Sequence, residues 1–507
     1  MAILSLLQAH EYSGEWHLPG STQVISGQLR YSSQRAELEL NDAFTPVRGD
    51  VSISDTQPIY PAVHGASTKG DALTLLKAQR LGVSLNFGAG GMRQPESLFS
   101  SWVVVGAYVE PETTYSSVRF FIPGLEVWLS KPAIYQTTEQ DSATGKLTNI
   151  FVVRPTEGDT TPVPAIDATF EWGVGTTSSA NAYKTISVEV RGWVVIRPNK
   201  PQLLEWFLDQ QGKLATMLTF MAGVPMPVDA IHAYIGDAKR PVSVLVTLRQ
   251  AEVCTFQNLH DFFIPRSEVD ADFATLVANW FHETASVLVP SQLALSILST
   301  KTLWLHIEFL SLIQALEGFH RGRYPGNYMP DLAYDAVKGA LSGAIPATVA
   351  ADHRDALRSR IRYGNQISLS KRLNELQSFL GDSLASLIIG GDGKIPRTWI
   401  DTRNYHTHWD EDLRANAVDG QEMYNANVRM EHFLRAIYLL MMGIQPETLA
   451  RCLQNTSNTS QQLLQLNVIA RRKTDPTAPA GVLMTIGMLP GSSGKAAEPA
   501  DPSATPT

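Results

Sequence analysis

The chain of 507 residues has a formal net charge of −8, and 44% of its residues are hydrophobic. A constitutive nucleic-acid-binding protein usually carries a basic excess, so this balance argues against tight binding to bulk nucleic acid. No apolar run approaches the roughly 18 residues that cross a bilayer, and Cys254 and Cys452 form neither a disulfide framework nor a zinc pattern. The apolar segment from Met1 to Gln8 lacks a basic leader and makes a poor signal peptide. We therefore expect a cytoplasmic protein with no membrane contact, no bound metal and no cofactor.

Residues 1–200 are predicted to form a β-rich antiparallel domain. Apolar and polar residues alternate with the period of two that strands show, as in residues 36–40, and the segment from Gly14 to Gly20 has the composition of a turn. The strands expected from this pattern cover residues 24–29, 36–40, 102–109, 118–122, 186–190 and 192–196. Gly and Pro between these runs favour a sandwich or a barrel-like domain, but periodicity does not encode the order of the strands.

Residues 201–290 are predicted to be a mixed connecting region. Apolar side chains from Leu203 to Leu218 recur at helical spacing, and the segment from Gly223 to Pro227 ends that helix. The run from Val242 to Val246 has the composition of a strand.

Residues 291–455 are predicted to form an all-α bundle. A long helix is expected from Ser291 to His320, with Trp304 and Ile307 in its buried stripe. The further helices expected cover residues 351–362, 368–379 and 421–442. Antiparallel helices joined by short loops make a bundle. Residues 474–507 are rich in Pro, Ala, Ser, Thr and Gly, which is typical of a disordered tail.

One segment between two of these helices, Arg403-Asn404-Tyr405-His406-Thr407-His408, combines side chains that suit RNA cleavage. Arginine offers a fixed fork of donors for a phosphate, and histidine can move a proton near neutral pH. On this interpretation Arg403 holds the scissile phosphate and His408 is the general acid or base. Asn404 donates to a phosphate or fixes the turn, and His406 is a rival for the proton transfer.

The spacing between Arg403 and His408 constrains how they can meet. Five residues at about 100° each leave the two side chains pointing well apart on a continuous helix. They converge only if a helix starts or kinks in this segment, or if a second protomer completes the site. The Gly-rich loop and Pro396 just upstream favour a helix start.

Three further arginines, Arg354, Arg358 and Arg362, follow one another at intervals of four residues and so line one helix face. Two interpretations remain open. The stripe is a solvated face paired with Asp352 and Asp355, or it contacts RNA phosphates beside the catalytic segment.

The segment from Arg403 to His408 resembles the signature of the HEPN superfamily, an Arg, often an Asn, and a His after four to six intervening residues. The run from Leu312 to His320 is similar to the end of the family's long first bundle helix. The opening Gly-x-Trp-x-Leu-Pro-Gly of residues 14–20, followed by a β-rich region and then the bundle, resembles the ApeA-like anti-phage proteins in particular. The resemblance covers roughly residues 12–455.

This resemblance implies a metal-independent endoribonuclease in which two protomers place their Arg and His residues across a shared cleft. RNA is then cut by its own ribose 2′-hydroxyl, and the protein acts as an abortive-infection effector that a phage-derived trigger activates. We expect a homodimer or a higher homo-oligomer, with Glu317 orienting an Arg or a His of the neighbouring helix. One alternative is a binding module whose β domain recognises a phage component or a sugar-like ligand, while the bundle only dimerises. Another is the toxin of a toxin–antitoxin pair with the same chemistry.

Overall fold

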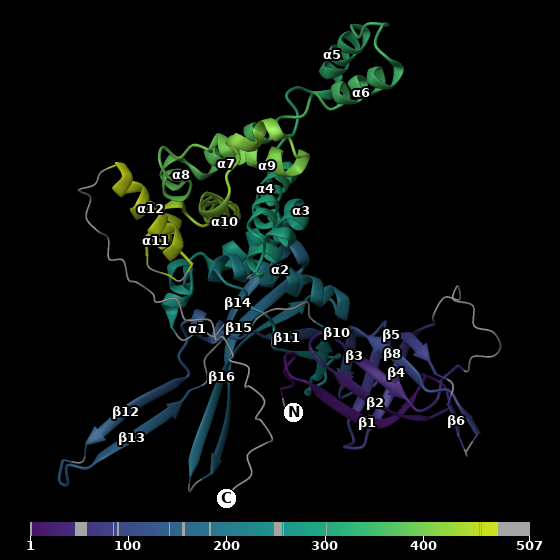
Figure 1. Ribbon diagram of the computed structural model, residues 1–507. Helices are drawn as coiled ribbons and strands as arrows, with labels where there is room; N and C mark the ends of the chain where they lie inside the picture. Colours follow the sequence, from purple (N-terminus) through teal and green to yellow (C-terminus); the bar gives the residue numbers. More distant parts are fainter. Residues whose placement is uncertain are drawn as a thin grey trace, which may run out of the picture.

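The computed structural model describes residues 3–45, 58–84, 86–88, 91–140, 142–154, 158–181, 184–247, 256, 258–300, 302–455, 457 and 459–474. In this part of the chain an antiparallel β-rich region is followed by a helical region, which confirms the predicted α+β fold (Figure 1). Cys254 and residues 475–507, which make up nearly all of the predicted tail, lie outside the described residues. None of the helices described is long and apolar enough to cross a membrane.

A closed barrel forms the first part of the β-rich region. β8 pairs with β3 on one side and with β5 on the other, so the order β5-β4-β1-β2-β3-β8 returns to its beginning. The barrel strands are β1 (His10–His17), β2 (Ile25–Tyr31), β3 (Ala36–Leu40), β4 (Ile59–Ser67), β5 (Ala72–Val83) and β8 (Glu96–Ser100). Closure leaves no free edge between these strands, and it confirms the barrel-like alternative of the two architectures that the sequence favoured.

The start of the barrel differs from the sequence prediction, because Gly14 lies inside β1 and not in a turn. A Cβ atom on Gly14 would lie 2.2 Å from the carbonyl oxygen of Ala66 on β4. On the same strand pair, a Cβ on Gly65 would lie 2.3 Å from the ring of the fully buried Trp16. Glycine therefore allows β1 and β4 to approach closely while Trp16 fills the core between them.

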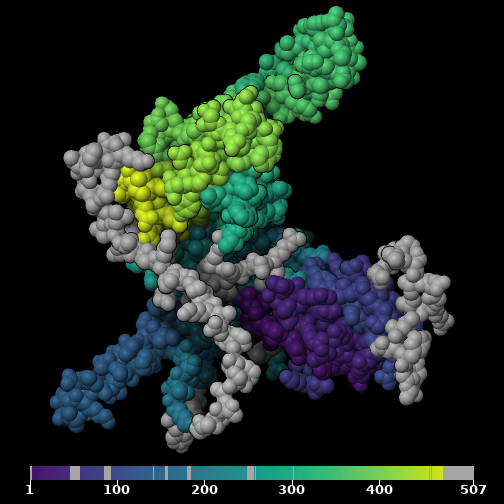
Figure 2. Space-filling model, viewed as in Figure 1, coloured from purple at the N-terminus to yellow at the C-terminus, as the bar shows by residue number. Residues whose placement is uncertain are grey.

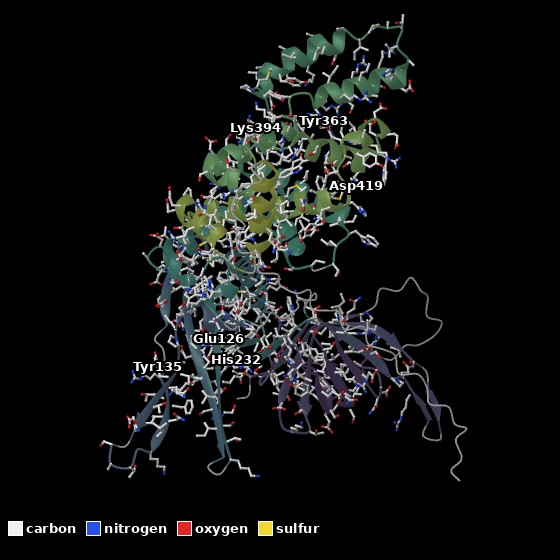
Figure 3. The ribbon with its side chains drawn as sticks, turned by 60° about the vertical axis from the view of Figure 1, so that its left-hand side comes forward. Glu126, Tyr135, His232, Tyr363, Lys394 and Asp419 are labelled. Carbon is white, nitrogen blue, oxygen red and sulfur yellow. The ribbon has the colours of Figure 1, made fainter. Side chains whose placement is uncertain are left out.

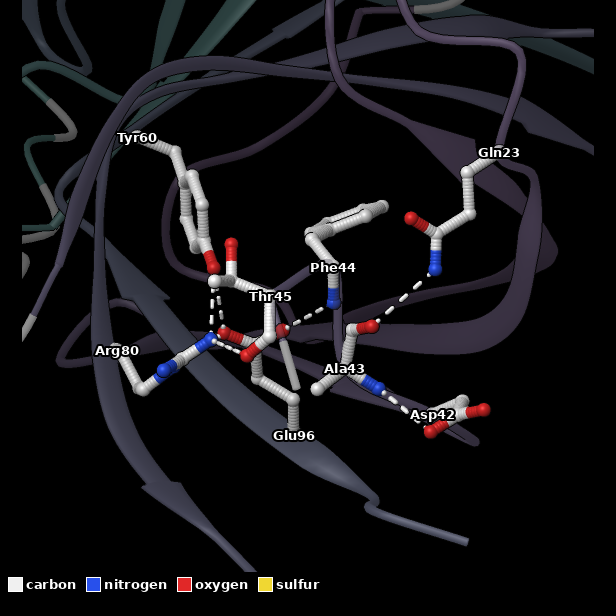
Figure 4. Close-up of polar contacts among 8 residues, drawn as sticks. All are labelled: Gln23, Asp42, Ala43, Phe44, Thr45, Tyr60, Arg80 and Glu96. Atoms are coloured by element: carbon white, nitrogen blue, oxygen red, sulfur yellow. Dashed lines mark hydrogen bonds and ion pairs between the residues drawn. The ribbon is translucent and has the colours of Figure 1, made fainter. Parts of the chain in front are cut away.

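The barrel encloses a polar network centred on an ion pair between Arg80 and Glu96 (Figure 4). Arg80 Nε donates to Glu96 Oε1 at 2.6 Å, and both side chains are almost completely buried. Tyr60 donates to the same carboxylate, Phe44 N donates to its other oxygen, and Arg80 Nη2 donates to Thr45 O. The network thus fastens the chain after β3 to the inside of the barrel.

The sheet continues beyond the barrel through β9, which pairs with β5, in the order β9-β19-β18-β11-β16-β15-β14. These strands are β9 (Trp102–Val105), β19 (Val242–Val246), β18 (Ala230–Tyr234), β11 (Ser117–Phe121), β16 (Thr185–Pro198), β15 (Ala168–Asn181) and β14 (Asp159–Val163). The predicted strands 186–190 and 192–196 are two parts of the single strand β16. β18 and β19, which come from the predicted connecting region, are integral strands of this sheet.

Two β-hairpins project from this sheet (Figures 1 and 2). One consists of β12 (Ile134–Gln140) and β13 (Leu147–Val153), and Figure 3 labels Tyr135 on it. The other is the outer half of β15 and β16. The remaining short elements are β6 (Asn86–Gly88), β7 (Gly91–Arg93), β10 (Thr114–Tyr115), β17 (Gln202–Leu203) and α1 (Leu125–Trp128).

The helical region begins with α2 (Leu204–Ala222), then α3 (Phe273–Leu298) and α4 (Leu305–Arg323). The prediction of one helix from residue 291 to 320 is wrong, because the chain leaves the helical path between α3 and α4. Ser and Thr side chains compete for backbone carbonyls at this break, where Thr300 Oγ1 bonds Ser296 O. As a result Trp304 and Ile307, which were predicted to be buried, are 79% and 44% exposed.

The later helices agree more closely with the prediction. α6 (Ala351–Arg362) has the predicted bounds, and α7 (Leu369–Leu380) and α10 (Gly420–Met442) each differ from them by about one residue. The other helices are α5 (Asp331–Gly343), α8 (Asp382–Ile388), α9 (Arg397–His408), α11 (Pro446–Gln454) and α12 (Gln461–Thr474). α10 is buried on nearly all sides and contacts α2, α3, α4, α7, α8 and α12, so it is the centre of the bundle.

The domain limits at residues 200, 290 and 455 stay a prediction. The limit at residue 290 falls at Pro290, inside α3, where Val287 leaves the helical conformation. α3 also packs against α2, α4, α10 and the strand β14, so this helix joins the β-rich region to the bundle.

Candidate active site on helices α4 and α9

Helix α9 carries the whole predicted catalytic segment and lies against α4 and α7. It begins after Pro396, whose fixed φ and missing N–H suit a helix start. Trp399 and Ile400 are buried, and Thr402 Oγ1 accepts a hydrogen bond from Val418 N in the chain that leads to Asp419 and α10. These contacts fix the rotation of α9 and therefore the direction of the residues that follow.

Arg403 points toward α4 and meets Glu317 there. Its Nη2 atom lies 4.0 Å from Glu317 Oε2, and its side chain is 31% exposed. Asn404 accepts a hydrogen bond from Arg403 Nη1 at 3.2 Å, so it orients the guanidinium through its side-chain oxygen. Glu317 in turn accepts two hydrogen bonds from Arg321, one helical turn further along α4. Two guanidinium groups thus share one carboxylate at a partly exposed surface.

Arg321 is a residue that the sequence analysis missed. The signal was present, since Glu317 and Arg321 are four residues apart on a predicted helix and such pairs face each other.

A polar cluster near Arg321, in which His320 and Arg372 are buried and Glu375 is partly exposed, was also missed. His320 Nδ1 accepts a hydrogen bond from Arg372 Nη1 at 3.1 Å, and His320 Nε2 lies 2.7 Å from Glu375 Oε2. Because arginine can only donate, His320 Nδ1 carries no proton and its Nε2–H donates to Glu375. Burial, and then the nearby charge of Arg321, lowers the pKa of Arg372. No spacing in the sequence connects α4 with α7, so only the fold brings these residues together.

The two histidines of the segment occupy different sides of α9. His406 follows Arg403 by three residues and shares its face of the helix, whereas His408 is turned away from Arg403 by about 140°. α9 begins six residues before Arg403 and has helical geometry throughout, so the expected convergence through a helix start at this point does not occur. His408 is the last residue of α9 and is exposed.

His406 lies against a third histidine, His306 near the start of α4. The ring centroids are 5.9 Å apart and the ring planes differ by 19°. Burial, and then repulsion from His306, lowers the pKa of His406. The lowered pKa favours the neutral ring, which is the form that can accept a proton.

The arginine stripe of α6 lies elsewhere. α5 and α6 form a hairpin that projects from the bundle, apart from α9 (Figures 1 and 2). Arg354 donates to the carbonyl groups of Ala347 and Val349, and Arg358 pairs with Asp355. The structure thus does not bring the stripe beside Arg403, and contact with RNA there stays a prediction that needs a strand long enough to reach both places.

Within the described residues, no three His, Cys, Asp or Glu side chains are grouped as a metal site would require. Comparison with known families finds two matches. Residues 11–280, just over half of the chain, match the ApeA N-terminal domain 1, and residues 310–448 match the Apea-like HEPN domain. No curated protein and no solved structure matches the chain. The order of the two matched regions follows the observed order of barrel, sheet and bundle. The chain therefore belongs to the ApeA-like family of anti-phage HEPN proteins.

Proposed function

We propose that this protein is an endoribonuclease that cleaves RNA during phage infection, with its active site on α4 and α9. The observation that carries the proposal is the position of Arg403. Its guanidinium is partly exposed, it lies 4.0 Å from the carboxylate of Glu317, which Arg321 also contacts, and it shares a helix face with a histidine. An arginine held this loosely can exchange part of its contact with Glu317 for a phosphate.

The proposed reaction needs no water molecule as nucleophile. The ribose 2′-hydroxyl loses its proton to a basic group and attacks the adjacent phosphorus, and the bond from phosphorus to the 5′-oxygen breaks. The leaving oxygen takes up a proton, and the products are a 2′,3′-cyclic phosphate and a free 5′-hydroxyl. Arg403 offsets the charge that builds on the phosphate oxygens in the transition state.

Two histidines are available for the two proton transfers. Within one chain, His406 is on the side of Arg403, and its lowered pKa favours the neutral ring that can accept a proton. His408 points away from Arg403 of its own chain, so it reaches a phosphate at Arg403 only if a second copy of α9 faces the first. We propose that the protein acts as a homodimer or a higher homo-oligomer in which His408 of one copy serves the site of the other.

The β-rich region is the proposed sensor that keeps the nuclease inactive until infection. Abortive infection follows if cleavage of host RNA stops growth before the phage completes its cycle. The net charge of −8 supports a resting state that binds cellular RNA weakly.

Host RNA after phage challenge tests this function. Cells would carry the wild type, Arg403→Ala, His408→Ala or His406→Ala, with equal expression and folding checked for each. RNA breakdown and protection that require Arg403 and at least one of the histidines support the proposal. Protection that survives every substitution overturns it and favours the binding-module alternative. A requirement for an inhibitor gene next to this one would support the toxin–antitoxin alternative.

A further inference from the structure

Beside Arg403 five rings form one continuous surface. We call them the ring surface: Trp304, His306, Tyr405, His406 and Trp409. From Trp304 to His306, from His306 to His406 and from His406 to Trp409, the successive ring centroids are 6.5, 5.9 and 6.3 Å apart. Tyr405 lies 5.0 Å from His406 and 6.1 Å from Trp409.

The two tryptophans at the ends of this surface expose large apolar rings to water, which is unfavourable for the isolated chain. Trp304 is 79% exposed and Trp409 is 73% exposed, although tryptophan is usually largely buried. Trp409, the residue directly after α9, has a φ of 53°, a left-handed conformation in which glycine is favoured and other residues are strained. An exposed ring at a strained position contributes little to folding, so both features favour a binding role.

We propose that the ring surface stacks the unpaired bases of single-stranded RNA next to the phosphate that Arg403 holds. The proposal rests on the proposed function, because it places these bases beside the same scissile phosphate. Aromatic and imidazole rings bind splayed bases in this way, while bases inside a duplex are covered by their neighbours. His406 connects the two parts of the site, since it belongs to the ring surface and lies three residues from Arg403 on α9.

The charges around the ring surface favour bases over phosphates as its ligand. Asp410, Glu411 and Asp412 follow Trp409 directly. Glu411 is paired with Arg414, and the carboxylates of Asp410 and Asp412 repel a phosphate backbone. A strand bound here therefore turns its bases toward the rings, and its backbone runs on the side of Arg403. The His and Tyr rings also offer polar edges to the hydrogen-bonding groups of a base, which an apolar contact between two copies of the chain does not require.

Binding of strands that cannot be cleaved tests this surface in the full-length protein. Fluorescence anisotropy would compare a short single-stranded 2′-O-methyl RNA, the same strand in a duplex, and an abasic strand of equal length. We expect the single strand to bind best. Trp304→Ala and Trp409→Ala would each weaken its binding about tenfold, while Trp409→Phe would retain most of it. The matched control is Tyr135→Ala, which removes an exposed ring from the projecting β12–β13 hairpin and would leave binding unchanged.

Salt dependence separates stacking from electrostatic binding. Trp409→Ala would lower the affinity and leave the slope of log affinity against log salt unchanged, whereas Arg403→Ala would reduce that slope by about one. Equal binding of the abasic strand, or full binding by the double variant Trp304→Ala/Trp409→Ala, would overturn the proposal. A loss of oligomer mass in that double variant would also overturn it, because the rings would then form a contact between copies.

The 2′-O-methyl strand lacks the attacking hydroxyl, so its binding is measured whether or not the protein cleaves RNA. A result that contradicts base stacking on the ring surface can therefore be distinguished from a result that contradicts the nuclease proposal.

Discussion

The barrel interior and the surface between α4 and α9 each hold an arginine beside a glutamate, but only one of the two pairs is closed. Arg80 and Glu96 are 2.6 Å apart and almost completely buried, and further hydrogen bonds join the pair to Tyr60 and to the backbone. Arg403 and Glu317 are 4.0 Å apart and partly exposed. The first pair is enclosed by the barrel, and the guanidinium of the second is partly open to solvent. Satisfied hydrogen bonding is therefore a better guide to function here than charge pairing alone.

Breaking the closed pair should have the largest effect on stability. Glu96→Ala leaves the Arg80 guanidinium buried without its counter-charge, so we expect the free energy of unfolding to fall by about 3–5 kcal/mol. Urea unfolding followed by circular dichroism measures this. The control is Glu39→Ala, which removes the partner of Arg30 from an exposed pair on the same barrel and should cost less than about 1 kcal/mol. Equal losses in the two variants would show that the barrel network is not structural.

Removing Arg403 from its partly exposed pair with Glu317 should instead affect catalysis. Arg403→Ala should lower RNA cleavage by about 100-fold to 1000-fold, because it removes a donor that acts in the transition state. Its unfolding free energy should change little, since the side chain is partly exposed. Lys394→Ala is the control, because Lys394 lies just before α9 and its ion pair with Asp392 is exposed on both sides, at 78% and 66%. Initial rates on a defined RNA give the comparison, and similar rate losses in both variants would contradict it.

A buried histidine in the β-rich region should make the stability of the fold depend on pH. Burial, and then the nearby Arg119, lowers the pKa of His232 on β18 to about 4 (Figure 3). The unfolded chain takes up a proton near pH 6.5 and the folded chain only near pH 4. Stability is therefore fully present above pH 6.5 and is lost as the pH falls between these values, by about 3 kcal/mol in total.

His232→Gln should remove most of this pH dependence, which unfolding curves at pH 7 and pH 4.5 would show. His282→Gln, at a side chain that is 78% exposed, should retain it. An unchanged pH dependence in His232→Gln would mean that other groups produce the acid sensitivity.

The smallest expected effect is that of Arg321, which shares the Glu317 carboxylate with Arg403. Arg321→Ala frees Glu317 to hold Arg403 more firmly, so we expect about a tenfold loss of cleavage with an increased KM for RNA. Glu317→Gln should partly restore activity in the Arg321→Ala background, because it removes the competing charge. Strictly additive effects of the two substitutions would contradict this coupling.

The sequence correctly predicted those elements whose apolar periodicity and end signals lie within one short segment. α6 and α10 were correct because their periodicity and their flanking Gly and Pro residues are contained in the same segment. The break before α4 was missed because Trp304 fits an apolar stripe, although the structure leaves it exposed. Gly14 was assigned to a turn because the close approach of β4 to β1 does not appear in local composition.

In the candidate site, too, local patterns were predicted from the sequence and contacts between distant segments were not. Arg403, His406 and His408 were predicted as one short motif, whereas the pairing of Glu317 with Arg321 was missed although their helical spacing is present in the sequence. The contacts of His320 with Arg372 and Glu375 join α4 to α7 and needed the folded chain. The rotation of His408 away from Arg403 depended on where α9 begins, which the spacing alone left open.

Cleavage of one defined RNA by the protein purified from phage-infected cells, with its product ends analysed, tests the central claim most directly. The substrate would be offered with EDTA present, and again with deoxyribose in place of ribose at the mapped cleavage position. The account predicts that EDTA leaves cleavage intact, that the products carry a 2′,3′-cyclic phosphate, and that the deoxy substitution stops cleavage there. Cleavage at the deoxy position, or products with a 5′-phosphate, would contradict attack by the ribose 2′-hydroxyl.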